Sequence, residues 1–382
     1  MIEKYQRYPA ATLFGLVFHA HSNPVGFSLS LPSSRRLVST LNRRRFTQLA
    51  SLAGLAAATG CRRSLPSEVV WSLGWLPDVE YGNLWVALDQ GYMRREGVRA
   101  SYLPGGPNAP QPVIVVASQQ STLGDAEWLP FLDAVMQGND FVVIAAQFPI
   151  LPTGIITLPR RAMHKPSDLV GGRFLVQGPS ERNELIATFK LNHLPMDYKL
   201  IPVGFSPEAL LQGEGDAYFC YITNQPTMLE NMGLKKGKDF FVTRIYDLGY
   251  KIPSSLLFVE RSFLQAQRKQ LVGFLKAMLR GRAANMGDLN LAPRLAVEKY
   301  GADLGLELQQ QTTLNRLQVQ LEVEPGTNIP FWFSQQSIAN MYNIASVTGR
   351  ANLPPPSHTI DLSLLEEAWR DLSSTTNPGA TS

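Results

Sequence analysis

Short apolar or β-branched runs alternate with segments of helical periodicity between residues 69 and 259, and this alternation constrains the fold more than any other feature. Strands are predicted at 69–74, 98–103, 122–126, 141–147, 154–158, 174–177, 199–203, 217–221, 240–245 and 255–259. Helices are predicted at 83–95, 113–117, 128–137, 181–192, 207–212 and through most of the chain from residue 260. The run 113–117 is β-branched, which favours a strand, but the alternation requires a helix there. The pattern predicts an α/β fold with parallel-rich sheets flanked by helices and a helical C-terminal segment.

The order of the strands indicates two lobes. The strands between 141 and 158 are followed by a further series of strands and helices, and the strand at 255–259 suggests a return to the lobe that the chain left. The roughly 320 residues after the N-terminal segment are long enough for two lobes. We therefore predict a leader at 1–60, a first lobe built from 61–155 and 253–372, a second lobe at 156–252 and a disordered tail at 373–382.

Residues 42–61 have the pattern of an export signal that ends in a cysteine. Arg43 and Arg44 precede an apolar run at 49–58, which is too short to span a bilayer as a helix. The paired arginines resemble a twin-arginine signal, and Thr59-Gly60-Cys61 resembles a bacterial lipobox. These patterns predict export from the cytoplasm and lipidation of Cys61. The alternative is the N-terminal hydrophobic helix of a cytosolic protein.

The basic character of the whole sequence comes from this leader. Residues 1–60 hold seven of the 35 Lys and Arg residues and one of the 31 Asp and Glu residues, which leaves 28 basic and 30 acidic side chains. The pI near 9.0 therefore gives no reason to expect binding to nucleic acid. Cys61 and Cys220 are the two cysteines, so acylation of Cys61 excludes an intramolecular disulfide. We expect a monomer whose fold depends on its apolar core.

Several short segments, weak one by one, resemble a known family in their order and spacing. They are Trp75-x-Pro77 with Tyr81-Gly82 and Gly91, Lys165-Pro166 leading to Gly171-Gly172-Arg173, Gly213-Glu-Gly-Asp-Ala217, and Ile329-Pro330 before a helix at 334–348. This series is similar to that of bacterial solute-binding proteins that serve ABC importers for thiamine-pyrimidine precursors, aliphatic sulfonates, taurine and nitrate. The resemblance implies a two-lobed clamshell of the periplasmic-binding-protein type, which closes on a small-molecule ligand. It also implies an ABC permease of the inner membrane as partner, and a periplasmic or cell-surface location with a membrane tether through Cys61.

The candidate ligand-binding residues lie in loops that follow strands, where open parallel sheets bind their ligands. They are Trp75, Asp78, Tyr81, Asp125, Glu127, Trp128, Phe148, Gln177, Ser180, Tyr221 and Asn224. Some have structural alternatives: Trp75 and Trp128 suit core packing, and Asp78, Asp125 and Glu127 suit helix caps. The nearby Cys220 suits a buried small residue.

This set of residues is aromatic and acidic. A sulfonate or nitrate site should offer Arg, Lys, hydroxyls or helix N-terminal amides, and Arg182 is the one nearby cation. Trp and Tyr faces stack on flat rings, and carboxylates accept hydrogen bonds from ring amino groups. The predicted ligand is therefore a planar heterocycle, first a formylaminopyrimidine-like thiamine precursor and second a flavin-like ring. A small oxyanion is the alternative.

An enzyme and a sensor are the rival functions. A eukaryotic relative of the resembled family makes the thiamine pyrimidine with a cysteine-rich iron site and a histidine. Here Cys220 is the sole cysteine after the leader, and His164, His193 and His358 are scattered, without metal-ligand spacing. We therefore expect no catalysis, no metal and no cofactor. A clamshell that reports its ligand to a signalling partner is compatible with the same sequence.

Overall fold

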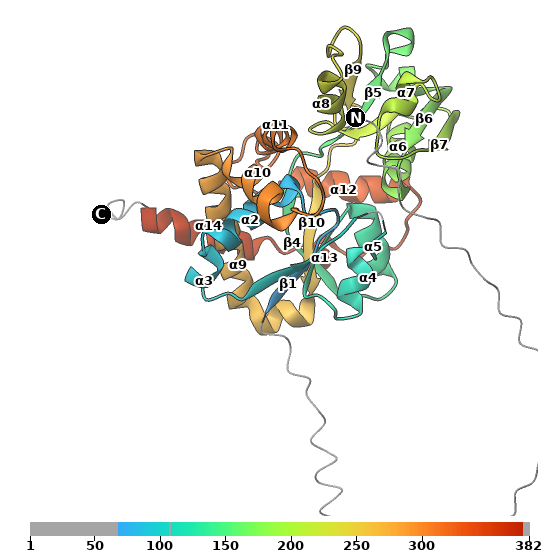
Figure 1. Cartoon of the computed structure of the whole chain (residues 1–382). Helices are drawn as coiled ribbons and strands as arrows, with labels where there is room; N and C mark the ends of the chain where they lie inside the picture. Colours follow the sequence, from blue (N-terminus) through green and yellow to red (C-terminus); the bar gives the residue numbers. More distant parts are fainter. Residues whose placement is uncertain (1–67, 107, 377–382) are drawn as a thin grey trace, which may run out of the picture. The chain divides into compact units, whose positions relative to one another are not determined.

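The computed structural model describes residues 68–106 and 108–376 (Figure 1). The predicted export signal, Cys61 and residues 377–382 lie outside the described residues, so the predictions made for them stay predictions. Within the described part, no helix is both long and apolar enough to cross a membrane.

The first sheet has the strand order β2-β1-β3-β10-β4. Its strands are β1 (Val69–Ser72), β2 (Ala100–Leu103), β3 (Leu123–Ala126), β4 (Phe141–Phe148) and β10 (Ser254–Glu260). Strand β1 pairs in parallel with β2 and β3, whereas β10 runs antiparallel to both β3 and β4. Every residue of β4 is buried, although β4 is the last strand in this order, and an isolated bridge joins its Val143 to Ile360.

The second sheet has the order β7-β6-β8-β5-β9 and comes from one continuous stretch of chain. Its strands are β5 (Thr153–Thr157), β6 (Gly172–Val176), β7 (Tyr198–Pro202), β8 (Ala217–Tyr221) and β9 (Phe241–Arg244). Strand β6 pairs in parallel with β7 and β8, and β5 is antiparallel to β8 and β9. The helices of this lobe are α6 (Pro179–Leu191), α7 (Glu208–Leu211) and α8 (Gln225–Asn231), drawn in green to olive in Figure 1.

These sheets confirm the two-lobed α/β fold and show where the chain crosses between lobes. It leaves the first sheet between residues 148 and 153 and returns between 244 and 254. The strand that follows each crossing, β5 or β10, is the reversed strand of its sheet. The boundary predicted at 155 falls inside β5, because an apolar run does not reveal which sheet its strand joins.

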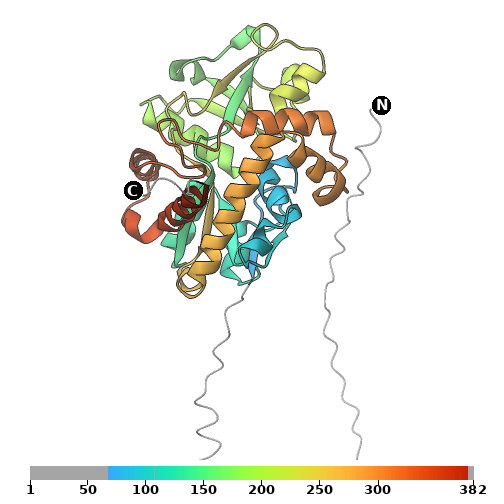
Figure 2. The same ribbon diagram turned by 90° about the vertical axis from the view of Figure 1, so that its left-hand side faces the viewer.

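Helices cover the first sheet. The helices α2 (Gly82–Asp89), α3 (Tyr92–Arg95), α4 (Pro112–Ala117) and α5 (Trp128–Met136) alternate with its strands. The C-terminal part adds α9 (Arg261–Gly287), α10 (Leu291–Leu295), η5 (Ala296–Tyr300), α11 (Leu308–Gln318), α12 (Gln335–Val347), α13 (Pro356–Thr359) and α14 (Ser363–Thr376). Figure 2 shows the long α9 beside the blue α2 and α3, with α14 against it. Its apolar stripe is buried as predicted, with Leu271 and Leu275 fully inaccessible.

Three local predictions have clear outcomes. The β-branched run 113–117 is helical, as the alternation required. The helix predicted at 83–95 is instead two helices, α2 and α3, because Gly91 adopts a left-handed conformation (φ +69°) that interrupts the first. The disorder predicted from residue 373 is wrong at its start, since α14 continues to Thr376.

Candidate functional site

A cavity of about 450 Å³ lies among the loops that follow strands of both sheets. Its lining includes six carboxylates: Asp78, Glu80, Asp125, Glu127, Glu181 and Glu184. None of the described residues that line it is Lys, Arg or His. Its volume is typical of a pocket that encloses a small organic molecule.

The structure brings ten of the eleven candidate residues together around this cavity. They are Trp75, Asp78, Tyr81, Asp125, Glu127, Phe148, Gln177, Ser180, Tyr221 and Asn224. They come from both lobes, which agrees with the expectation that strand-end loops converge. Ligand contact by each residue stays a prediction.

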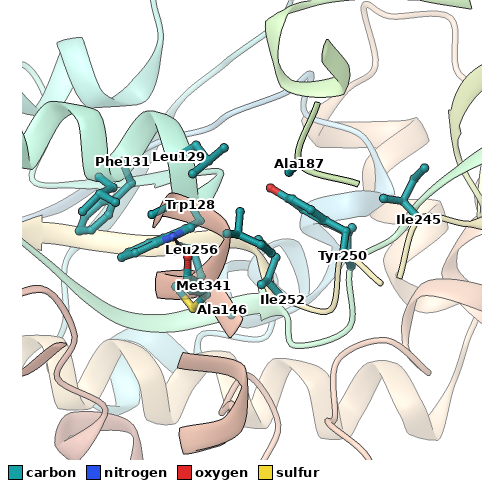
Figure 3. Packing of buried hydrophobic residues seen from close by; sticks show 14 of the residues in the cluster. Trp128, Leu129, Phe131, Ala146, Ala187, Ile245, Tyr250, Ile252, Leu256 and Met341 are labelled. Carbon is teal, nitrogen blue, oxygen red and sulfur yellow. Dashed lines mark hydrogen bonds between the residues drawn. The ribbon is translucent and has the colours of Figure 1, made fainter. Parts of the chain in front are cut away.

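Trp128, the eleventh candidate, lies elsewhere. Its ring is fully buried in the core, and its indole Nε1 donates a hydrogen bond to the carbonyl of Met341 at 2.6 Å (Figure 3). Phe131, one turn further along α5, lies 5.9 Å away between ring centroids. Trp128 therefore joins α5 to α12 and does not line the cavity. The apolar residues around it in α5 are consistent with this core position.

Asp125 at the end of β3 is the most strongly held of the six carboxylates. It accepts hydrogen bonds from Trp71 Nε1 at 2.7 Å and from the Gly74 amide at 2.9 Å. Gly74 permits this approach, since a Cβ there would lie 2.6 Å from Asp125 Oδ2. Burial nevertheless raises the pKa of Asp125 to about 7, because donors that carry no charge only partly replace water around a carboxylate.

Asp78 and Glu80 belong to the loop after β1. Asp78 caps the short helix η2 (Val79–Tyr81) by accepting from the Glu80 amide at 2.8 Å, so the capping alternative is confirmed for it. Burial raises its pKa to about 6. Burial and the nearby charges of Asp78, Asp125 and Glu127 raise the pKa of Glu80 well above its usual value.

Glu127 and Glu184 each accept a hydrogen bond from a residue at one of the two crossings, the segments in which the chain passes between the lobes. Glu127 Oε1 accepts from Ser254 Oγ at 2.7 Å, whereas its carboxylate does not cap α5. Glu184 Oε2 in α6 accepts from Thr153 Oγ1 at 2.6 Å. Burial raises the pKa of both carboxyls.

Glu181 precedes Glu184 by one helical turn and has an unfilled acceptor. Its Oε2 is buried and has no hydrogen-bond partner among the described residues. Burial raises its pKa as well. Sequence reasoning missed Glu181 and Glu184, although their spacing of three residues at the start of a helix that follows a strand was available as a signal.

Aromatic rings supply the apolar part of the cavity. Trp75 stacks on Phe205 with 6.0 Å between ring centroids and 27° between planes, and Phe205 follows a strand of the other lobe. Phe205 was missed because nothing in its local sequence predicts contact with a loop 130 positions away. Cys220 also lines the cavity, and burial raises the pKa of its thiol.

The arrangement can bind a molecule that offers hydrogen-bond donors or positive charge and a flat apolar face. Carboxylates accept hydrogen bonds from N–H groups, and Trp75, Phe205 and Tyr221 offer ring surface. Among the described residues, those of the cavity included, no group of three or more His, Cys, Asp or Glu side chains is placed to hold a metal ion.

Comparisons with known proteins agree with this architecture. The family model described as NMT1/THI5 like matches residues 79–288. No curated protein sequence gives a significant match.

Among solved structures, a protein from Bordetella bronchiseptica RB50 has a TM-score of 0.61 and 16% identity, covering 81% of this chain and 98% of that one. The periplasmic aliphatic sulphonate binding protein SsuA from Escherichia coli has a TM-score of 0.59 and 16% identity, covering 78% and 92%. The desulfurization enzyme DSZB has a TM-score of 0.53 and 11% identity, covering 80% and 100%.

Structures at these identities share the fold with this chain, and the fold serves binding proteins and an enzyme alike. The family model, in contrast, spans more than half of the sequence, including the short helix η2, the whole second lobe and the return strand β10. The chain therefore belongs to the NMT1/THI5-like family and has the two-lobed fold of periplasmic binding proteins.

Proposed function

We propose that this chain is the solute-binding component of an ABC importer and that its cavity takes a planar heterocycle with amino groups. The observation that carries the proposal is the lining of the cavity: aromatic rings and six carboxylates, with no Lys, Arg or His among the described lining residues. The E. coli relative of this fold, by its name, binds aliphatic sulphonates in the periplasm. The fold and the periplasmic role are compatible with that relative, whereas the chemistry of the cavity favours a different ligand.

A sulfonate is disfavoured by charge. Its negative group would enter a cavity in which burial first, and neighbouring carboxylates second, already raise the pKa values of Glu80 and Glu184. An aminopyrimidine reverses the interaction, because its N–H groups donate to carboxylates and its ring packs against Trp75 or Tyr221. A thiamine pyrimidine precursor of the formylaminopyrimidine type is our first candidate.

The sequence signals complete the proposal. Export by the twin-arginine route and lipidation of Cys61 would place the protein in the periplasm or on the cell surface, tethered to a membrane. Closure of the lobes on the ligand would create the surface that an inner-membrane permease recognises.

An enzyme is a weaker alternative. The one cysteine in the cavity, Cys220, is buried, and its raised pKa keeps the thiol protonated and poorly nucleophilic. Cysteine-based chemistry of the usual thiolate kind is therefore not supported by this site.

A thermal-shift and calorimetric panel tests the proposal. The mature chain is mixed with N-formyl-4-amino-5-aminomethyl-2-methylpyrimidine, 4-amino-5-hydroxymethyl-2-methylpyrimidine, riboflavin, taurine and nitrate. We expect stabilisation by a pyrimidine and none by the two anions. Stabilisation by taurine or nitrate alone would overturn the proposed ligand.

The aromatic contact has its own test. Trp75→Ala should weaken pyrimidine binding by about tenfold or more, because a ring that stacks on the ligand is lost. Trp369→Ala is the matched control, since Trp369 is half-buried in α14 and does not line the cavity. Equal affinities of the two variants would assign Trp75 to packing only.

A further inference from the structure

We infer that the ligand of this cavity carries a positive charge, and that Glu127 and Glu184 receive its cationic group at the two crossings between the lobes. The inference rests on the proposed function and narrows its ligand class from any planar heterocycle with amino groups to one that carries a cationic group, so that the free aminomethylpyrimidine replaces its formylated form as the first candidate.

The first step is the position of Glu127. Its Oε1 accepts from Ser254 Oγ at 2.7 Å and from the Ser255 amide at 3.3 Å, at the start of β10, where the chain has just returned from the second lobe. Ser255 has a φ of +50°, a conformation that residues with a Cβ rarely adopt. Glu127 is therefore bonded to the backbone of one crossing at a strained position.

Glu184 occupies the equivalent position at the other crossing. Its Oε2 accepts from Thr153 Oγ1 at 2.6 Å, and Thr153 is the first residue of β5, where the chain has just entered the second lobe. Glu184 is 4% exposed. Each crossing thus has one cavity carboxylate bonded to the residue at which the new strand begins.

The second step is the charge that these two groups share. The negative charge of Glu127, from the first lobe, raises the pKa of Glu184, from the second. Glu181 adds to the pKa of both, and its buried Oε2 has no partner among the described residues. Carboxylates of both lobes therefore face each other without a cation between them in the described lining, and one acceptor is left open.

A buried carboxylate without a positively charged partner is energetically costly. A cationic group on the ligand would offset the repulsion among Glu127, Glu181 and Glu184, where the lobes join. The cavity is far larger than one ion needs, and five aromatic side chains line it, so the cation should be part of a flat organic molecule. A protonated aminomethyl group on a pyrimidine has this chemistry. Glu127 and Glu184 are also hydrogen-bonded to Ser254 and Thr153, where the chain passes between the lobes. A cationic ligand that neutralises the two carboxylates would therefore link its own charge to closure of the lobes.

The experiment compares two probes of nearly the same shape. Calorimetry at pH 7.5 measures the binding of 4-amino-5-aminomethyl-2-methylpyrimidine, whose side group is an ammonium, and of 4-amino-5-hydroxymethyl-2-methylpyrimidine, whose side group is neutral. We expect the ammonium probe to bind about tenfold to a hundredfold more tightly, the range of a charged over a neutral hydrogen bond. Taurine is measured in parallel.

The variants locate the effect. Glu127→Gln and Glu184→Gln should each lower the ratio of ammonium-probe affinity to neutral-probe affinity by about tenfold, because glutamine carries no charge. Glutamine still accepts from Ser254 or Thr153, so the crossings keep their hydrogen bonds. Glu214→Gln is the matched control, because Glu214 is an exposed residue of the second lobe outside the cavity.

The outcomes separate this inference from the proposed function. Equal binding of the two probes, or tighter binding of the neutral one, overturns the inference and leaves the proposed function standing. A preference that both glutamine variants retain overturns the assignment to Glu127 and Glu184. Binding of taurine, or of neither pyrimidine, overturns the proposed function and the inference with it. The wild-type ratio decides the charge of the ligand even if a variant fails to fold.

Discussion

Buried carboxylates occur in two regions of this protein, and the two regions satisfy them differently. Outside the lining of the cavity, Glu322 is fully inaccessible, and its two oxygens accept from Arg282 Nε at 2.7 Å and from Asn83 Nδ2 at 2.6 Å. Asn83 continues into a buried amide network with Asn285 and Asn315. In the cavity, six carboxylates have hydroxyl, indole or backbone donors at most, and no described lining residue is a cation.

The difference lies in whether the protein itself supplies a cation to a buried carboxylate. Burial raises the pKa of Glu322 to about 7, although Arg282 opposes the rise, so even a paired internal carboxylate is expensive. Both partners of Glu322 come from helices of the protein itself, Arg282 from α9 and Asn83 from α2. In the cavity no described lining residue supplies a cation, and under the proposed function the ligand does so.

The largest expected effect concerns the ion pair between Glu322 and Arg282. Arg282→Ala should lower the free energy of unfolding by about 3–5 kcal/mol, because it leaves Glu322 buried and unpaired. Urea denaturation at pH 8 measures it. Arg294→Ala is the control, since its partner Asp288 lies on the surface, where an ion pair contributes about 1 kcal/mol or less. Similar losses in the two variants would break the comparison.

The second prediction concerns pH and ligand affinity. Asp78 and Asp125 have pKa values of about 6 and about 7, and the pKa of Glu184 is raised as well. Asp78 and Asp125 therefore gain protons between pH 8 and pH 5, which removes negative charge that attracts a cation. Affinity for the aminomethylpyrimidine should therefore fall by about tenfold or more between pH 8 and pH 5.

Calorimetry across this range measures the fall, and the hydroxymethylpyrimidine corrects for protonation of the ring itself. An affinity for the ammonium probe that stays constant, or that rises as the pH falls, would contradict the assigned role of the carboxylates.

The smallest expected effect is a gain in stability. Glu80→Gln should raise the free energy of unfolding of the ligand-free protein by about 1 kcal/mol at pH 8, because it removes a crowded charge from the cavity. The folded pKa of Glu80 is raised, so its charge destabilises the fold only as the pH rises above the unfolded value, near 4.5. Below that pH both states are protonated, and the gain should vanish.

Thermal unfolding of Glu80→Gln and of the control Glu214→Gln at pH 4 and pH 8 measures this effect. A loss of stability at pH 8 would show that Glu80 is a structural carboxylate like Glu322, and would remove it from the binding region.

The sequence alone determined the order of strands and helices, the two lobes and the loops that carry the site, because these depend on local periodicity and on turns. It placed Trp75, Asp125 and Tyr221 at strand ends, and the structure brings all three to one cavity. It also predicted the acidic and aromatic character of that cavity, because the loops that follow the strands meet at one edge of each sheet and bring their side chains with them.

Tertiary structure decided what depends on partners distant in sequence. Trp128 entered the core because Met341, 213 positions away, accepts its indole hydrogen bond. The role of Glu127 appeared only when Ser254, 127 positions away, was brought beside it. Local patterns carry no information about such pairs, because packing between elements, and not the sequence around each residue, determines which strand ends meet.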